Sequence, residues 1–157
     1  MRVLILGGDG MLGHKAAQVL SQRFDVYATF RDPQGPWRAF PMYASAAPDR
    51  LIAGVNAQDF HSIVRALGAA RPDVVINCIG IVKQLKAASD PVISLTINAL
   101  FPHQLADLCS ATGARLFHVS TDCVFSGRKG NYTEADLTDA EDLYGRTKLL
   151  GELDRPG

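Results

Sequence analysis

The chain carries no surplus of charge of either sign, because sixteen Lys and Arg residues balance sixteen Asp and Glu residues. Non-specific nucleic-acid binders need surplus basic groups to neutralise phosphates, so no nucleic-acid partner is expected, and an acidic ligand must be held by local geometry. No apolar run approaches the roughly twenty residues that span a bilayer, so no membrane partner is expected either. The sequence also contains no internal repeat and no low-complexity tract.

Cysteine and histidine are few and are not spaced for metal binding. Cys78, Cys109 and Cys123 are odd in number and form no Cys-x-x-Cys pair. Cys78 and Cys109 fall in apolar periodic segments, which predicts reduced core thiols. The four histidines have no mutual metal-ligand spacing, so no metal is expected. The N-terminus enters a strand pattern without a cleavable signal, and together these features predict a cytoplasmic protein.

Short apolar runs alternate with longer helical patterns along the chain. Its length predicts one domain, residues 1–157, with a sizeable core. Continuous apolar runs such as RVLILG are typical of strands covered on both faces, and their alternation with helices predicts an α/β fold with a Rossmann-like, doubly wound parallel sheet. The expected strands cover residues 2–7, 24–30, 51–55, 71–80 and 115–120, and the expected helices cover residues 11–23, 58–69, 90–112 and a segment around residue 144.

Local signals refine these elements. Asp90 fits the N-cap of the long helix, and Pro102 in its middle should bend or interrupt it. Gly68 should lie near the end of the preceding helix. Residues 31–48 contain four prolines and should be irregular, and the acidic residues within 134–142 should form a solvated face.

The stretch GGDGMLG places Gly7, Gly10 and Gly13 between a predicted strand and a predicted helix. Glycine there permits a tight turn, close approach of the backbone to a pyrophosphate and close packing of helix on strand. The helix N-terminus would direct free N–H groups at the phosphates. The pattern therefore predicts a dinucleotide site, whereas three glycines without the flanking strand and helix would mark only a turn.

The choice of nicotinamide cofactor depends on the end of the second strand, which reads TFRD. An acidic residue there binds the ribose hydroxyls of NAD, whereas an arginine favours the 2′-phosphate of NADP. Arg31 precedes Asp32, so the sequence favours NADP over NAD as the cofactor. The alternative is that Arg31 is a solvated surface residue.

Three residues suit carbonyl chemistry. Thr121 follows the fifth predicted strand, at the sheet edge where ligands bind in open α/β folds. Tyr144 and Lys148 are four residues apart and share one helix face. A free phenol is a poor proton donor at neutral pH, and a nearby ammonium favours its ionised form. With a hydroxyl from Thr121 on the same substrate oxygen, these groups suit hydride transfer to or from a carbonyl; the alternative is a chance, solvated Tyr-x-x-x-Lys pair.

Six strings, in order and over nearly the whole chain, resemble the extended short-chain dehydrogenase/reductase family in its nucleotide-sugar branch. They are GGDGMLG, RPDVVINCIG, DPVISLTINA, VSTDCVFSG, YTEAD and YGRTKLLGE. The sequence is most similar to the dTDP-4-dehydrorhamnose reductase group and related sugar-nucleotide reductases. That likeness depends on the Ser-Thr-Asp-x-Val-Phe-x-Gly string, where epimerases and dehydratases usually carry other residues.

By position, the resemblance implies that Thr121, Tyr144 and Lys148 are the catalytic residues, with Tyr144 and Lys148 also contacting the cofactor and Lys148 holding the nicotinamide ribose. Asn98 matches a helix asparagine that the family keeps near the active site. The family usually has an acidic residue where Asn56 stands. The other implied cofactor contacts are Gly10, Met11 and Leu12 under the pyrophosphate, Asn56 and Ala57 near the adenine, and Cys78, Ile79 and Gly80 at the fourth strand's edge.

The activity that the resemblance implies is NAD(P)-dependent reduction of a 4-keto-6-deoxy sugar nucleotide. The alternatives are a nucleotide-sugar epimerase or dehydratase that uses NAD, and a non-catalytic dinucleotide-binding module. Family members continue past the tyrosine helix with further strands and a small domain that grips the nucleotide sugar. We therefore expect residues 1–157 to lack the C-terminal strands and the substrate domain and to be inactive or slow alone. Three explanations stay open: a truncated piece, a shortened reading frame, or a domain that another chain completes. The expected protein partner is a second copy in a homodimer or a completing C-terminal chain.

Overall fold

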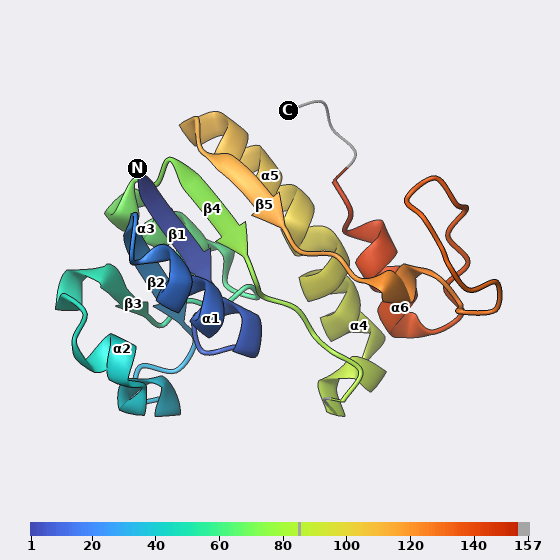
Figure 1. Ribbon diagram of the computed structural model, residues 1–157, viewed down its shortest axis with the longest axis horizontal. Coiled ribbons are helices and arrows are strands. Elements are labelled where there is room, and N and C mark those ends of the chain that lie inside the picture. Colours follow the sequence, from blue (N-terminus) through green and yellow to red (C-terminus); the bar gives the residue numbers. More distant parts are fainter. Residues whose placement is uncertain (85, 154–157) are drawn as a thin grey trace. The chain divides into compact units, whose positions relative to one another are not determined.

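The computed structural model describes residues 1–84 and 86–153, which include a five-stranded sheet (Figure 1). The strand order is β3-β2-β1-β4-β5, and β1 pairs in parallel with β2 and β4 while β2 pairs in parallel with β3. This order, with helices between the strands, confirms the predicted Rossmann-like α/β fold. The strands are β1 (Arg2–Leu6), β2 (Asp25–Phe30), β3 (Leu51–Ala53), β4 (Val74–Asn77) and β5 (Arg115–His118).

The helices follow the predicted order. Gly68 lies near the end of the third helix, as expected, and the helix stops where Arg71 adopts a left-handed conformation (φ 45°) and donates its N–H to the Leu67 carbonyl. The α-helices are α1 (Met11–Leu20), α2 (Pro41–Ala44), α3 (Phe60–Ala70), α4 (Pro91–Ser94), α5 (Phe101–Thr112) and α6 (Leu143–Leu150). None of the helices in the described ranges is both long and apolar enough to cross a membrane.

The chain divides into two compact units. The first comprises Met1–Ile79 and Asp107–Phe117, and the second comprises Gly80–Ala106 and the described residues of His118–Gly157. The first unit contains the glycine turn and most of the predicted cofactor contacts. The second contains the three residues predicted to be catalytic.

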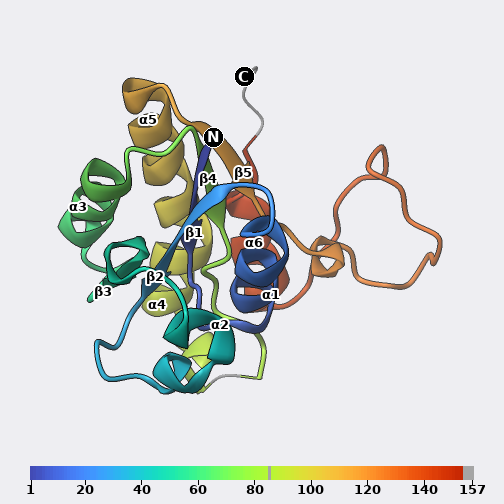
Figure 2. The same ribbon diagram turned by 60° about the vertical axis from the view of Figure 1, so that its left-hand side comes forward.

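The core of the first unit lies on both faces of β1. Val3 and Ile5 pack in one cluster with Ala17 of α1, and all three are at most 2% exposed. Leu4 and Leu6 alternate with them and are fully buried. Figure 2 shows α1 and α3 on opposite faces of the sheet, which explains why β1 has no polar face. Burying each large aliphatic side chain contributes about 1.5–3 kcal/mol.

The proline-rich segment after β2 is more ordered than the sequence predicts. It forms the short helices η1 (Pro36–Ala39), α2 and η2 (Pro48–Arg50). The ring of Trp37 stacks on Phe30 with centroids 3.8 Å apart, and the Tyr43 hydroxyl donates to the carbonyl of Gly8 at 2.7 Å. Aromatic burial therefore fixes a segment that prolines alone would leave irregular, and it fixes it against the glycine turn.

In the second unit, the predicted helix over residues 90–112 is interrupted as its proline requires. The Asp90 carboxylate accepts the N–H groups of the second and third residues of α4, at 2.8 and 3.2 Å, which confirms the predicted N-cap. A π-helical stretch, η4 (Leu95–Leu100), separates α4 from α5. Pro102 has no N–H to donate to the carbonyl four residues earlier, and the wider π turn accommodates that missing hydrogen bond.

Candidate active site

The glycine turn joins β1 to α1 and is held by backbone hydrogen bonds. Gly7 is left-handed (φ 82°), the N–H of Gly10 donates to its carbonyl at 3.1 Å, and the N–H of Gly8 donates to the Thr29 carbonyl at 2.8 Å. The Thr29 hydroxyl, on a residue only 1% exposed, accepts the N–H of Gly7 at 3.2 Å. Thr29 therefore anchors the turn to β2, a role that its place in an apolar strand did not reveal.

Gly13 and Gly10 differ in what surrounds them. A Cβ on Gly13 would lie 2.1 Å from the Gly7 carbonyl oxygen, so no side chain fits between α1 and the end of β1. A Cβ on Gly10 would meet only that same oxygen, at an ordinary 3.4 Å, and the Gly10 backbone is extended (φ −74°, ψ 158°). Nothing in the described part of the chain therefore requires glycine at position 10.

The N-terminal end of α1 is open to solvent. Met11 is 93% exposed and Leu12 is 50% exposed, which is a large exposure for apolar side chains. The N–H groups of a first helical turn have no partners within the helix. This end of α1 can therefore hold a negatively charged group.

The residues expected at the adenosine end follow β2 and β3. Arg31 comes directly after β2 and is exposed. The Asn56 side-chain oxygen accepts the N–H of Gln58 at 3.1 Å, so this amide stabilises its own turn. Ala57 is buried, at 6% exposed, and offers backbone groups only. These positions lie at the carboxyl ends of their strands, as the sequence predicts, and the contacts of Arg31 and Asn56 with a cofactor remain predictions.

The end of β4 lies against the glycine turn. A Cβ on Gly7 would be 3.2 Å from Cγ1 of Ile79 and 3.4 Å from the carbonyl carbon of Cys78. Burial raises the pKa of the Cys78 thiol to about 11, and it raises the pKa of Cys109 to the same value. All three cysteines are free thiols, and Cys109 is buried, as predicted for core thiols.

In the second unit, Lys148 is buried on α6, at 5% exposed. Its ammonium donates to the carbonyl of Val119 at 2.7 Å and lies 3.4 Å from Nε2 of His118. Burial lowers the pKa of Lys148, and Glu152 acts in the opposite direction. The hydrogen bonds of the ammonium therefore tie α6 to the chain that leaves β5. The i, i+4 spacing with Tyr144 did not predict these partners.

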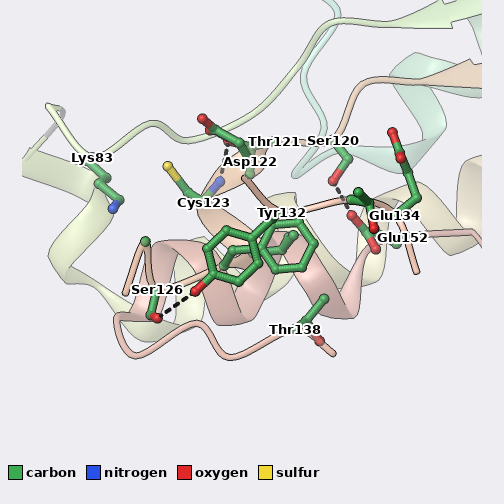
Figure 3. Close-up of a pocket in the computed structure, with 14 residues that line it drawn as sticks. Lys83, Ser120, Thr121, Asp122, Cys123, Ser126, Tyr132, Glu134, Thr138 and Glu152 are labelled. Carbon is green, nitrogen blue, oxygen red and sulfur yellow. Dashed lines mark hydrogen bonds between the residues drawn. The ribbon is translucent and has the colours of Figure 1, made fainter. Parts of the chain in front are cut away.

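Thr121 and Tyr144 line two cavities of the second unit. Thr121 lines a cavity of about 830 Å³, and its hydroxyl accepts the N–H of Cys123 at 3.2 Å (Figure 3). Tyr144 lies in a neighbouring cavity of about 440 Å³. Lys83 lines both cavities. Lys83 therefore borders the cavities that the two predicted catalytic residues line.

Lys83 and Asp142 were missed as site residues by sequence reasoning. Asp142 does not merely form part of a solvated face, because its carboxylate accepts the N–H of Gly145 at 2.7 Å and so caps α6. Its other oxygen lies 2.7 Å from Nζ of Lys83. The hydrogen bond from Lys83 holds the pKa of Asp142 below its usual range, and the Gly145 N–H adds to this effect.

Asn98 holds the segment that begins at Gly80. Its side chain donates to the carbonyl of Ile81 at 3.0 Å and accepts the Ile81 N–H at 2.8 Å, and it also approaches the Thr147 hydroxyl at 3.4 Å. Asn98 is 1% exposed, so its amide is used within the protein. A Cβ on Gly80 would lie 3.5 Å from this amide oxygen. Residues 1–84 and 86–153 contain no group of three or more His, Cys, Asp or Glu side chains arranged to hold a metal.

The parallel sheet, the turn of three glycines after β1 and the Tyr-x-x-x-Lys helix define a Rossmann-like domain of the short-chain dehydrogenase/reductase type. More narrowly, the chain belongs to the RmlD substrate binding domain family, whose model matches residues 1–154.

Two curated relatives illustrate the range of the family. The chain is 32% identical over 153 residues to the dTDP-4-dehydrorhamnose reductase of Streptomyces griseus, a match that covers 96% of this chain and 43% of the relative. It is 34% identical over 155 residues to methionine adenosyltransferase 2 subunit beta of Mus musculus, with 96% and 41% covered. The chain therefore spans less than half the length of these relatives.

Solved structures share the fold. The crystal structure of a hypothetical dTDP-4-dehydrorhamnose reductase from Sulfolobus tokodaii matches with a TM-score of 0.76 and 30% identity, covering 96% of this chain and 50% of that one. Bordetella bronchiseptica WbmG in complex with NAD has a TM-score of 0.79 and 21% identity, and Bacillus anthracis dTDP-4-dehydrorhamnose reductase in complex with NADP has 0.71 and 23%. Both matches cover 96% of this chain and 47% of the other, and at these identities they show the fold alone.

The half-buried imidazole of His118 gives a testable pH dependence. Burial, and then the charges of Lys148 and His103, lower the pKa of His118 from 6.5 to about 4. Between these values the unfolded chain binds more protons than the folded chain, so the unfolding free energy falls as the pH drops from about 6.5 to about 4. Allowing for the partial exposure of His118, we expect the unfolding free energy to fall by about 2 kcal/mol at pH 4 because of this group. Above pH 6.5 this loss is absent.

Urea unfolding of wild type and His118→Gln at pH 4, 5, 6 and 7 isolates this contribution, since carboxylate titrations are common to both proteins. The wild-type curve should fall more steeply with decreasing pH than that of His118→Gln. His61→Gln, which changes an exposed histidine, is the matched control and should follow wild type. Parallel curves for wild type and His118→Gln would contradict the assignment of a neutral, half-buried His118.

Proposed function

We propose that the chain is the dinucleotide-binding and catalytic part of an NAD(P)-dependent reductase of a 4-keto-6-deoxy sugar nucleotide. The observation that carries the proposal is Gly10, which lies at the open end of α1 and has no neighbour that excludes a side chain. A glycine without an internal reason is explained by a ligand that needs its backbone. A pyrophosphate at the N-terminus of α1 is such a ligand.

The residues of the turn fit a dinucleotide. The N–H groups of the first turn of α1 would bind the phosphates, and the space next to Gly10 would admit them. Cys78 and Ile79, beside Gly7, would border the cofactor, and Gly80 would continue that border along the chain. A bound nicotinamide cofactor would supply the hydride for carbonyl reduction.

The proposed roles of the protein groups follow from the chemistry of the carbonyl. Tyr144 would donate the phenolic proton to the substrate oxygen as the carbonyl carbon accepts the hydride, so the ketone becomes a secondary alcohol and the nicotinamide is oxidised. Thr121 would hold the same oxygen by a hydrogen bond. The Lys148 ammonium, which donates a hydrogen bond to the Val119 carbonyl, would stabilise the phenolate left behind. It would also bind the nicotinamide ribose.

Relatives support the substrate class. The Streptomyces griseus relative and the Sulfolobus tokodaii structure are both named dTDP-4-dehydrorhamnose reductase. The family match runs over residues 1–154, which include the glycine turn and all three proposed catalytic residues. A homodimer and a cytoplasmic location belong to the same proposal.

A second candidate function is a dinucleotide-binding module without catalysis. It is favoured by the match to methionine adenosyltransferase 2 subunit beta, a protein named as a subunit of a different enzyme. The catalytic groups distinguish the two candidates, because a pure binding module has no use for a proton donor at Tyr144.

Matched glycine substitutions test the cofactor site. Gly10→Ala should leave the fold stable, since its Cβ has room, but it should weaken NAD(P) binding at least tenfold by pushing on the pyrophosphate. Gly13→Ala should instead lower the unfolding free energy by several kcal/mol, on the order of a severe overpacking effect, because its Cβ would meet the Gly7 carbonyl oxygen. Calorimetric titration and urea unfolding measure the two effects. Unchanged affinity in a folded Gly10→Ala protein would mean that the cofactor lies elsewhere.

The cofactor preference is tested at Arg31. If Arg31 binds the 2′-phosphate, Arg31→Ala should weaken NADP binding by about 1.5–3 kcal/mol and leave NAD binding nearly unchanged. Arg23→Ala, at another exposed arginine, is the control. Equal losses for both cofactors would indicate a folding effect, and no loss for either would make Arg31 a surface residue.

Turnover is tested with Tyr144→Phe in the full protein, by following nicotinamide absorbance with a dTDP-4-keto-6-deoxyhexose present. The rate should fall by about a hundred- to ten-thousandfold, while cofactor affinity changes little, because the phenol acts mainly in the transition state. Tyr27→Phe, on β2, is the control. Full activity of Tyr144→Phe would rule out its role as proton donor. Cofactor binding by wild type without any turnover would favour the binding module.

A further inference from the structure

Lys83 is the side chain that three cavities of the second unit share. It lines the 830 Å³ cavity with Thr121, the 440 Å³ cavity with Tyr144, and a third cavity of about 300 Å³ with Cys123 and Asp142. Figure 3 shows the sulfur of Cys123 on the side that faces Lys83. A lysine in this place is a candidate for a role in the proposed active site, although no motif in the sequence indicated one.

Lys83 contacts the Cys123 side chain and two residues at the start of α6. Its Nζ lies 2.7 Å from one carboxylate oxygen of Asp142, and the other oxygen of Asp142 accepts the N–H of Gly145 at 2.7 Å. The same Nζ lies 5.6 Å from the centroid of the Tyr144 ring. One carboxylate therefore holds both the helix end that carries Tyr144 and the ammonium that faces its ring.

We infer that Lys83 is a positioning residue for Tyr144: its ammonium, fixed by Asp142, sets the orientation of the phenol ring. A cation within about 6 Å of a ring centroid is attracted to the negative face of the ring. A tyrosine on a helix can rotate about two side-chain bonds, and a cation on one face selects among those rotamers.

The Lys83 ammonium affects the orientation of the Tyr144 ring and not the overall stability of the protein. The side chains of Lys83 and Asp142 are 45% and 53% exposed, and exposed ion pairs contribute little to folding free energy. A proton donor, however, must meet its acceptor at hydrogen-bond distance and angle. The catalytic meaning of this orientation rests on the proposed function, but the orientation itself can be measured in the absence of substrate and cofactor.

The chain contains a matched control for the same arrangement. Lys129 lies with its Nζ 5.7 Å from the centroid of the Tyr132 ring and is paired with Asp136. Both lysines therefore combine a carboxylate partner with a tyrosine ring, in the same unit of the protein. Neutralising one lysine should affect only its own tyrosine.

The experiment is ¹⁹F NMR of the chain with fluorotyrosine at its four tyrosines. Tyr144→Phe assigns the Tyr144 resonance. Lys83→Met, which keeps the length of the side chain and removes its charge, should move the Tyr144 resonance and leave the other three in place, while Lys83→Arg should keep it close to wild type. Lys129→Met should move the Tyr132 resonance and not that of Tyr144.

A second measurement uses the wild-type protein, so it does not depend on correct folding of the Lys83→Met variant. Raising the salt from about 0.1 M to about 1 M shortens the screening length from about 10 Å to about 3 Å, so the Tyr144 resonance should move toward its position in Lys83→Met. An unmoved Tyr144 resonance in Lys83→Met, or equal displacement by Lys83→Met and Lys83→Arg, would overturn the inference. A displaced Tyr144 resonance in Lys83→Met, together with full turnover by Tyr144→Phe in the full protein, would count against the proposed function alone.

Discussion

The first unit depends on one contact that leaves no room for a side chain. The backbone of α1 at Gly13 approaches the Gly7 carbonyl so closely that a Cβ would lie 2.1 Å from its oxygen. Because of this approach, α1 begins against the end of β1, and Ala17 packs without exposure in the same cluster as Val3 and Ile5. The same geometry directs the first turn of α1 outward. The core on this face of the sheet and the open anion-binding end of the helix thus follow from a single missing side chain.

Local signals in the sequence predicted most of the fold. Apolar runs located the five strands, Asp90 marked the start of α4, and Pro102 marked the interruption that the π-helical stretch provides. The contacts that sequence reasoning missed join residues far apart in the chain. Thr29 and Gly7 are 22 positions apart, and Tyr43 and Gly8 are 35 apart. No periodicity or spacing links such pairs, since only the folded sheet brings them together.

In the candidate site too, local motifs could be predicted and long-range contacts could not. The glycine turn and the places of Tyr144 and Lys148 on α6 and of Thr121 after β5 could be predicted because their motifs are short and contiguous, while the catalytic roles of these three residues stay predictions. The partners of these residues could not. Lys148 shares a helix face with Tyr144, yet its recorded hydrogen bonds go to Val119 and His118, about 30 positions earlier. Helical spacing places side chains on a common surface, and burial then decides which partner each polar group finds.

The glycine turn has a consequence for a chain with no net charge. The Gly7 carbonyl accepts the Gly10 N–H, the Gly8 carbonyl accepts the Tyr43 hydroxyl, and the Gly10 carbonyl accepts the His14 N–H. The negative ends of these three peptide dipoles are therefore neutralised from within the protein, whereas the positive ends in the first turn of α1 face outward. The phenol of Tyr43 thus helps to hold the turn with its carbonyl groups occupied and the N–H groups of the helix end directed outward. Such N–H groups can bind an anion through oriented dipoles, without any lysine or arginine.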